Sequence, residues 1–211
     1  NGRLENALSD AKQRLQQQLA EETRINRKLV GLKGEMKRVA ILFDASGSMQ
    51  QSVAENGRNR WAEAQEIAAT WLQHLDVDFC ALVVFSTDVK TFPEDGALAD
   101  LRGPDGDAKR ADLLRQLRSV SPSGSTNTLA ALETAYGYER IDAILLFSDG
   151  APTNDQSGRI DPQIAQRIYD LCQVHKDVPI NSIGLGNYFD KDMATFLRSV
   201  AEITNGAFRG H

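Results

Sequence analysis

Asp44, Ser46 and Ser48 place three oxygen-bearing side chains at alternate positions around Gly47, directly after an apolar run. Carboxylate and hydroxyl oxygens are the ligands that hard divalent cations such as Mg²⁺ prefer. The glycine allows the tight backbone curvature that brings alternate side chains together. The residue types and their spacing therefore predict a metal site. Taken singly, the aspartate could instead belong to a turn or a helix N-cap, and the hydroxyls could cap local backbone groups.

Two later segments offer the same kind of oxygen ligand. Residues 123–128 read SGSTNT and contain the hydroxyl of Thr126. A second apolar run ends in Ser148, Asp149 and Gly150, which places another carboxylate just past a predicted strand. Taken alone, the threonine could cap a helix that begins near residue 129, and the second aspartate could sit in a plain turn. Together they extend the predicted metal site.

Two short apolar runs position these carboxylates. Residues 39–43 (VAILF) and 143–147 (AILLF) are too short for helices and too uniformly apolar for half-exposed strands, so both are predicted to be central strands covered on both faces. In an open parallel sheet, ligands bind beyond the carboxyl ends of the strands, where the strand order reverses. If the two strands are neighbours, Asp44 and Asp149 are expected to converge there.

Strands and helices alternate over the rest of the chain. This alternation predicts an α/β fold with a doubly wound, mainly parallel six-stranded sheet flanked by helices. The six strands are expected near residues 39–43, 78–86, 89–92, 143–147, 180–185 and 207–209. Helices are expected near 61–75, 109–119, 129–136, 162–172 and 191–202. The segment 94–107 is rich in Gly, Asp and Pro and predicts an exposed loop.

In this order, the DxSGS sequence, the loop with Thr126 and the strand that ends in SDG resemble the metal-ion-dependent adhesion site (MIDAS) of the von Willebrand factor type A (VWA) domain family. The resemblance runs from about Val39 to the C-terminus. It implies a Rossmann-like fold and a site for Mg²⁺, Mn²⁺ or Ca²⁺. The metal ligands that it implies are Asp44, Ser46, Ser48, Thr126 and Asp149. The loop departs from the family pattern at Gly124 and Ser125, where many relatives have two glycines, so its backbone is expected to be less free.

The resemblance also implies a function without catalysis: a metal-dependent protein-binding module for adhesion or scaffolding, in which an Asp or Glu of a partner protein completes the coordination of the metal. Two alternatives remain open. One is a metal-assisted hydrolase with Ser46 or Ser48 as nucleophile. Against it, His74, His175 and His211 are not placed near the motif by the sequence. The other is an adaptor subunit for an ATPase complex, as the resemblance to intracellular bacterial VWA proteins suggests.

The first 37 residues form a different kind of segment. Apolar residues recur there at alternating spacings of four and three over more than four heptads, from Leu4 to Met36, which predicts a coiled-coil helix with these residues in its seam, and a homo-oligomer. Gln18 and Glu22 interrupt the seam, and Gly31 and Gly34 are expected to weaken the last turns. The alternative is a single amphipathic helix packed on its own domain. The expected domains are therefore a coiled coil over residues 1–37 and a VWA domain over 38–211.

Charge and cysteine content restrict the partners and the compartment. Residues 1–38 carry nine basic and five acidic side chains, whereas the remainder is acidic, with fifteen and twenty-four. No nucleic-acid partner is expected of such an acidic domain. Cys80 and Cys172 lie on apolar faces and are predicted to be buried thiols, which favours a reducing, cytoplasmic location. The chain begins at Asn1 and is expected to be a fragment, with any membrane anchor in an upstream segment.

Overall fold

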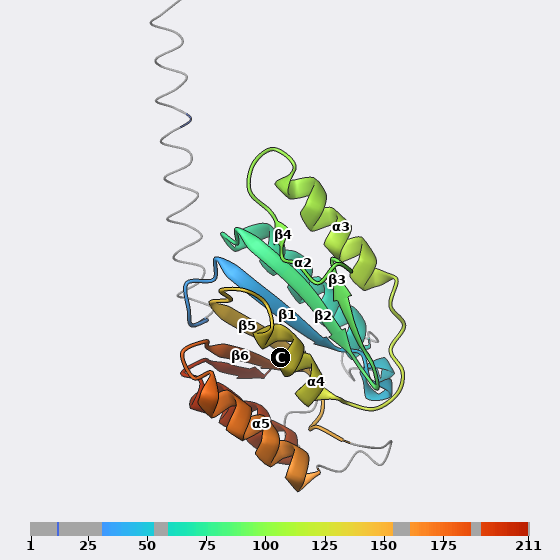
Figure 1. Cartoon of the computed structure of the whole chain (residues 1–211). Coiled ribbons are helices and arrows are strands. Elements are labelled where there is room, and N and C mark those ends of the chain that lie inside the picture. Colours follow the sequence, from blue (N-terminus) through green and yellow to red (C-terminus); the bar gives the residue numbers. More distant parts are fainter. Residues whose placement is uncertain (1–11, 13–30, 53–58, 154–160, 187–190, 211) are drawn as a thin grey trace, which may run out of the picture.

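The structure is a computed structural model that describes residues 12, 31–52, 59–153, 161–186 and 191–210. Within these residues a seven-stranded sheet lies between helices that cover both of its faces (Figure 1). The strands are β1 (Arg38–Asp44), β2 (Phe79–Phe85), β3 (Val89–Phe92), β4 (Ala99–Asp100), β5 (Ala143–Ser148), β6 (Ile180–Gly184) and β7 (Phe208–Gly210). The helices are the 3-10 helix η1 (Gly47–Gln50), α2 (Arg60–His74), α3 (Gly106–Arg118), α4 (Thr128–Tyr136), α5 (Pro162–Val174) and α6 (Lys191–Ile203).

The strands lie in the order β3-β2-β1-β5-β6-β7, with β4 paired to β2. β1, β2, β5, β6 and β7 run parallel to one another, and β3 and β4 run antiparallel to β2. The predicted mainly parallel, helix-flanked sheet is therefore confirmed. The predicted number of six strands is wrong, because β4 is a two-residue strand inside the polar, turn-rich segment that predicted a loop. Two residues are too few to show any alternation of apolar and polar side chains.

Both faces of β1 are buried, which explains its uniformly apolar sequence. Val39, Ile41 and Phe43 belong to the core layer shared with α2 and α3. Ala40 and Leu42 belong to the other layer, shared with α4, α5 and α6. Figure 1 shows α2 and α4 on opposite sides of the sheet. A strand that is buried on both faces has no solvent-facing positions, so its sequence does not alternate between apolar and polar residues.

The predicted N-terminal coiled coil falls largely on residues 1–11 and 13–30, which lie outside the described residues. The predicted helix does not extend to residue 37, because residues 31–37 are not helical. Gly31, Gly34 and Met36 all have positive φ angles there, which a right-handed helix does not accommodate. Met36, predicted to lie in the coiled-coil seam, is fully buried in the core of the domain, and Leu32 packs against the same core. The apolar side chains at the end of the heptad pattern therefore belong to the hydrophobic core of the domain.

Candidate metal centre

The two predicted carboxylates follow neighbouring strands. β1 and β5 are paired in parallel with Phe43 opposite Phe147, so Asp44 and Asp149 leave the sheet at the same edge. β1 is also the strand at which the strand order reverses, since β2 lies on one side of it and β5 on the other (Figure 1). Both aspartate side chains are buried from solvent. The topology thus brings two acidic groups together inside the protein, as the sequence predicted.

The Asp44 carboxylate is held by neutral donors. The Ser46 backbone N–H donates to its Oδ1 at 2.9 Å, and the Ser148 hydroxyl donates to its Oδ2 at 2.6 Å. Burial, followed by the negative charge of Asp149, raises the pKa of Asp44 from 3.8 to about 7, although the hydrogen bonds from Ser148 and Ser46 act in the opposite direction. The Asp44 carboxylate is therefore well oriented, but its negative charge is poorly neutralised. A bound cation would stabilise the ionised carboxylate.

The hydroxyls of the DxSGS segment turn toward Asp149. η1 brings Ser46 Oγ and Ser48 Oγ to 3.1 Å from each other. Ser48 Oγ also donates a hydrogen bond to Asp149 Oδ1 at 2.8 Å. Ser46 is buried and Ser48 is partly exposed, so the second hydroxyl lies nearer to solvent. The structure therefore links three of the five predicted ligands in one chain of oxygen contacts.

Thr126 joins the site from a third segment. The backbone N–H of Thr126 donates to Thr153 Oγ1 at 3.3 Å, and the Thr153 N–H donates to the Thr126 carbonyl at 3.2 Å. These bonds fasten the threonine beside the loop that follows Asp149. Its hydroxyl oxygen lies 4.0 Å from the position that a Cβ atom on Gly150 would occupy. All five predicted oxygen ligands therefore lie at one edge of the sheet, Asp44 at the end of β1 and the other four in the segments that follow the strands or precede α4.

The loop before Thr126 needs only one glycine. Gly124 has a φ of 86°, and a Cβ atom there would lie 2.5 Å from the hydroxyl oxygen of Thr87. Ser125 is not among the residues with positive φ, and its backbone N–H donates to the same threonine hydroxyl at 3.2 Å. A second glycine is thus unnecessary, and the departure from the usual glycine pair leaves the loop in a conformation that serine adopts without strain.

Arg60 is a site residue that the sequence analysis missed. It is the first residue of α2, and its Nη1 atom donates to Asp149 Oδ2 at 2.6 Å. Its side chain is 16% exposed and that of Asp149 is fully buried. A single arginine after a predicted loop carries no periodic signal. One available clue was its place in the first helical turn, where the helix dipole favours acidic residues over basic ones.

The two described histidines lie away from Ser46 and Ser48, the serines considered above as nucleophiles of a hydrolase. His74 is the last residue of α2 and His175 caps the end of α5, and each is followed by the amino end of a strand, at the sheet edge opposite the site. The imidazole of His175 stacks on Tyr136, with ring centroids 4.1 Å apart. His211 lies outside the described residues. Over the described part of the chain, no group of three or more His, Cys, Asp or Glu side chains is placed to hold a metal ion. A metal here would depend on hydroxyl ligands.

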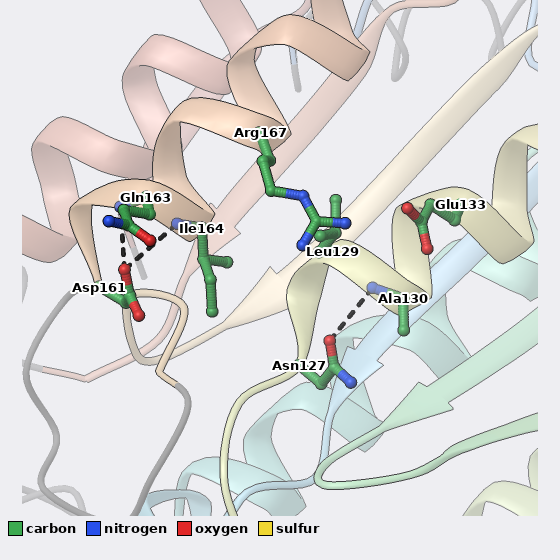
Figure 2. Close-up of a pocket in the computed structure, with 8 residues that line it drawn as sticks. All are labelled: Asn127, Leu129, Ala130, Glu133, Asp161, Gln163, Ile164 and Arg167. Carbon is green, nitrogen blue, oxygen red and sulfur yellow. Dashed lines mark hydrogen bonds between the residues drawn. The ribbon is translucent and has the colours of Figure 1, made fainter.

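A cavity of about 400 Å³ lies next to the site, between the amino ends of α4 and α5 (Figure 2). Asn127 directly follows Thr126 and caps α4, accepting a hydrogen bond from the Ala130 N–H at 3.2 Å. Figure 2 shows Arg167 of α5 pointing toward α4. The remaining lining residues are Leu129, Glu133, Asp161, Gln163 and Ile164. Because the lining carries both acidic and basic groups and none of the five predicted ligands, the cavity is a neighbour of the candidate metal centre.

Comparison with known proteins defines the class of this domain. A family model described as "von Willebrand factor type A domain" matches residues 39–151, which is more than half of the chain. The chain therefore belongs to the von Willebrand factor type A domain family. Domains of this family are generally protein-interaction or adhesion modules, and family membership agrees with the α/β fold.

Particular relatives extend this comparison. The chain is 34% identical over 92 residues to the human von Willebrand factor A domain-containing protein 3B, which covers 44% of this chain and only 6% of the relative. The solved von Willebrand factor type A structure from Catenulispora acidiphila has a TM-score of 0.60 and 19% identity, over 83% of this chain and 38% of that one. BatB from Bacteroides thetaiotaomicron has a TM-score of 0.56 and 18% identity, over 83% and 90% of the chains. At these identities the structures share the fold with this chain.

Proposed function

We propose that this chain is a divalent-metal-dependent protein-binding module that recognises an acidic group on a partner protein. Asp44 and Asp149 converge at the carboxyl ends of adjacent strands, and this convergence is the main support for the proposal. The general role of the family in protein interaction and adhesion agrees with it.

The side chains present fit a hard divalent cation. Asp44, Ser46, Ser48, Thr126 and Asp149 would hold the ion, as two carboxylates and three hydroxyls. Oxygen ligands of this kind suit Mg²⁺, Mn²⁺ or Ca²⁺, and the buried, poorly neutralised Asp44 is the strongest structural reason to place a cation here. A bound ion would supply an electrophilic centre for a carboxylate oxygen of the partner.

The residues of the chain prepare the site before any ligand binds. The Ser148 hydroxyl and the Ser46 backbone N–H orient Asp44. The Ala45 carbonyl accepts from the Ser123 N–H at 2.7 Å, which fixes the loop with the threonine against the end of β1. Pre-oriented ligands lose little conformational freedom on binding, so they favour affinity and selectivity.

Catalysis is not part of the proposal. Among the described residues, the carboxylate of Asp149 is the group that accepts the hydrogen bond of Ser48, and its other oxygen is already engaged by Arg60. Both described histidines lie at the opposite edge of the sheet. A binding role needs only the oriented oxygens that the structure contains. Protein binding is therefore better supported than hydrolysis.

Calorimetric titration with Mn²⁺ tests the metal site first. The wild type should bind about one ion per chain, and Asp149→Ala should abolish the binding. Asp100→Ala is the matched control, because Asp100 is an acidic residue paired with the amino end of β2, one strand length or roughly 20 Å from this edge. Equal binding by the wild type and Asp149→Ala would contradict the proposed site.

Selection from a displayed random-peptide library tests recognition of an acidic group. Peptides that bind in Mg²⁺ and are released by EDTA should be enriched in Asp and Glu, and their binding should be lost in Asp44→Ala. Enrichment that is indifferent to EDTA, or peptides without acidic residues, would contradict the proposed mode of recognition.

A further inference from the structure

Arg60 bears directly on how the candidate metal centre would bind an acidic ligand. Its guanidinium donates to Asp149 Oδ2 at 2.6 Å, while Ser48 donates to the other carboxylate oxygen at 2.8 Å. Both oxygens of Asp149 are therefore engaged by groups of the protein. A divalent ion that uses this carboxylate has to share it with the arginine or replace the arginine.

The position of Arg60 is imposed by its surroundings. Gly186 has a φ of 85°, and a Cβ atom on it would lie 2.3 Å from Arg60 Nε. The Arg60 side chain thus packs directly against the Gly186 backbone, in space that a side chain at position 186 would occupy. A basic residue at the first position of a helix is opposed by the helix dipole, so α2 gains nothing from a cation there. The contacts with Gly186 and Asp149 hold the charge in place.

The guanidinium also has unused hydrogen-bonding capacity. Over the described residues, its buried Nε has no hydrogen-bond partner. An arginine presents its donors as a planar fork that matches a carboxylate. Nη1 holds Asp149, and because the buried Nε is not reached from solvent, the donors that remain for a second acceptor are the other N–H groups of the terminal nitrogens. A carboxylate arriving at the site from solvent is an acceptor of the right shape and charge.

Counting charges shows what the arginine adds. Two carboxylates balance a divalent ion and the hydroxyls are neutral, so the five predicted ligands with their ion carry no net charge. Arg60 makes the loaded site positive by one charge. The domain as a whole is acidic, with twenty-four acidic and fifteen basic residues after residue 38, these site residues included. The local excess of positive charge that an acidic ligand needs is therefore carried by this arginine.

We propose that Arg60 competes with the metal ion for Asp149 in the free protein and turns to the partner's carboxylate when the ion is bound. It is thus a specificity-determining residue that couples metal binding to acidic-ligand binding. This inference rests on the metal-dependent function proposed above. Two sites that share one charged group are coupled reciprocally, so a carboxylate ligand strengthens metal binding through Arg60 and the metal strengthens carboxylate binding.

The test compares Mn²⁺ affinity in the wild type and in Arg60→Gln, in chloride and in acetate buffers of equal ionic strength. Acetate serves as the simplest carboxylate probe. In chloride, Arg60→Gln should bind Mn²⁺ about tenfold more tightly, because the competing cation is gone. Acetate should tighten Mn²⁺ binding to the wild type and have a smaller effect on the variant. Arg102→Gln is the matched control, because Arg102 pairs with the exposed Asp100, away from the site.

The outcomes separate this inference from the proposed function. If neither protein binds Mn²⁺, the metal site is wrong and the role of Arg60 falls with it. If the wild type binds and Arg60→Gln binds no more tightly, or acetate acts equally on both, the metal site stands and the competition is wrong. Weaker binding by Arg60→Gln would show that the arginine supports the metal site, which also overturns the proposal.

A measurement on the wild type covers the case in which Arg60→Gln does not fold. The proton–nitrogen resonance of Arg60 Nε can be assigned by its loss in Arg60→Lys. Addition of Mg²⁺ should shift this resonance and leave that of Arg102 in place, because the ion displaces the guanidinium from Asp149. A resonance that does not move at saturating Mg²⁺ would overturn the proposal.

Discussion

Asp44→Asn should stabilise the protein in EDTA, where no divalent metal ion is available to bind. Burial, followed by the charge of Asp149, raises the pKa of Asp44 from 3.8 to about 7, so ionised Asp44 costs the folded state free energy. Asparagine has nearly the same shape without the charge. Its Oδ1 can accept from the Ser46 N–H, and its amide can donate to the Ser148 hydroxyl, which already has the Gly150 carbonyl as acceptor at 3.0 Å. The substitution therefore leaves the hydrogen-bond network satisfied.

The size and sign of the effect follow from the pKa of Asp44. The difference between 3.8 and about 7 corresponds to roughly 4 kcal/mol at full ionisation, as an upper bound. The folded state binds this proton more tightly than the unfolded state, so the contribution of Asp44 to stability is full below about pH 4 and declines as the pH rises through about 7. At about pH 8 the free energy of unfolding of Asp44→Asn should exceed that of the wild type by about 2 to 4 kcal/mol, or roughly 4 to 16 °C in Tm.

Thermal melts in EDTA at several pH values measure this effect. The gain from Asp44→Asn should grow from near zero at about pH 4 to its maximum above about pH 7. Mg²⁺ should then raise the Tm of the wild type and leave that of the variant unchanged. Asp100→Asn, a change at an exposed carboxylate, is the control and should show neither effect. A variant that is less stable than the wild type at about pH 8, or a gain that does not depend on pH, would refute the reasoning.

Three further predictions concern other parts of the chain. Gly124→Ala should lower the free energy of unfolding by about 1 to 3 kcal/mol in urea denaturation, because the φ of 86° and the close Thr87 hydroxyl exclude a Cβ atom; an unchanged midpoint would contradict this. Burial raises the pKa of the Cys80 and Cys172 thiols to about 12, so both should react with iodoacetamide at about pH 8 only as fast as the protein unfolds. Rapid labelling of the folded protein would contradict their burial. The chain should sediment as an oligomer and a version without residues 1–30 as a monomer, if the heptad pattern forms a coiled coil.

The strands that carry the carboxylates could be predicted because burial on both faces leaves a continuous apolar run. Phe43 and Phe147 end such runs, and the polar residues Asp44 and Ser148 that follow them are the last residues of β1 and β5, at the edge where the strand order reverses. Residue types, spacing and strand position therefore predicted that Asp44 and Asp149 converge if the two strands are neighbours, which the pairing of β1 with β5 confirms. Occupancy by a metal stays a proposal.

Other features were beyond the sequence patterns for physical reasons. β4 consists of two residues that pair with β2 through backbone hydrogen bonds, and backbone pairing leaves no trace in side-chain identity. Met36 fitted the heptad spacing, but spacing cannot tell an intermolecular seam from the core of the same domain. Arg60 reaches Asp149 across eighty-nine positions of sequence, and a contact of that range is set by the packing of α2 on the sheet. Each miss depended on tertiary structure.

The three loops of the candidate metal centre are joined by backbone hydrogen bonds from Gly47 N–H to the Gly124 carbonyl at 3.1 Å and from Thr153 N–H to the Thr126 carbonyl at 3.2 Å. The loop with Thr126 is also joined to the end of β2, because Asn127 N–H donates to the Ser86 carbonyl at 3.0 Å. The oxygen ligands are therefore assembled only when β1, β2 and β5 are side by side. Any opening motion that separates β1 from β5 would therefore also move the predicted ligands of the candidate metal centre apart. Bound metal should consequently slow the hydrogen exchange of buried amides along these strands, even far from the ion, by a factor that grows with the ratio of the metal concentration to its Kd.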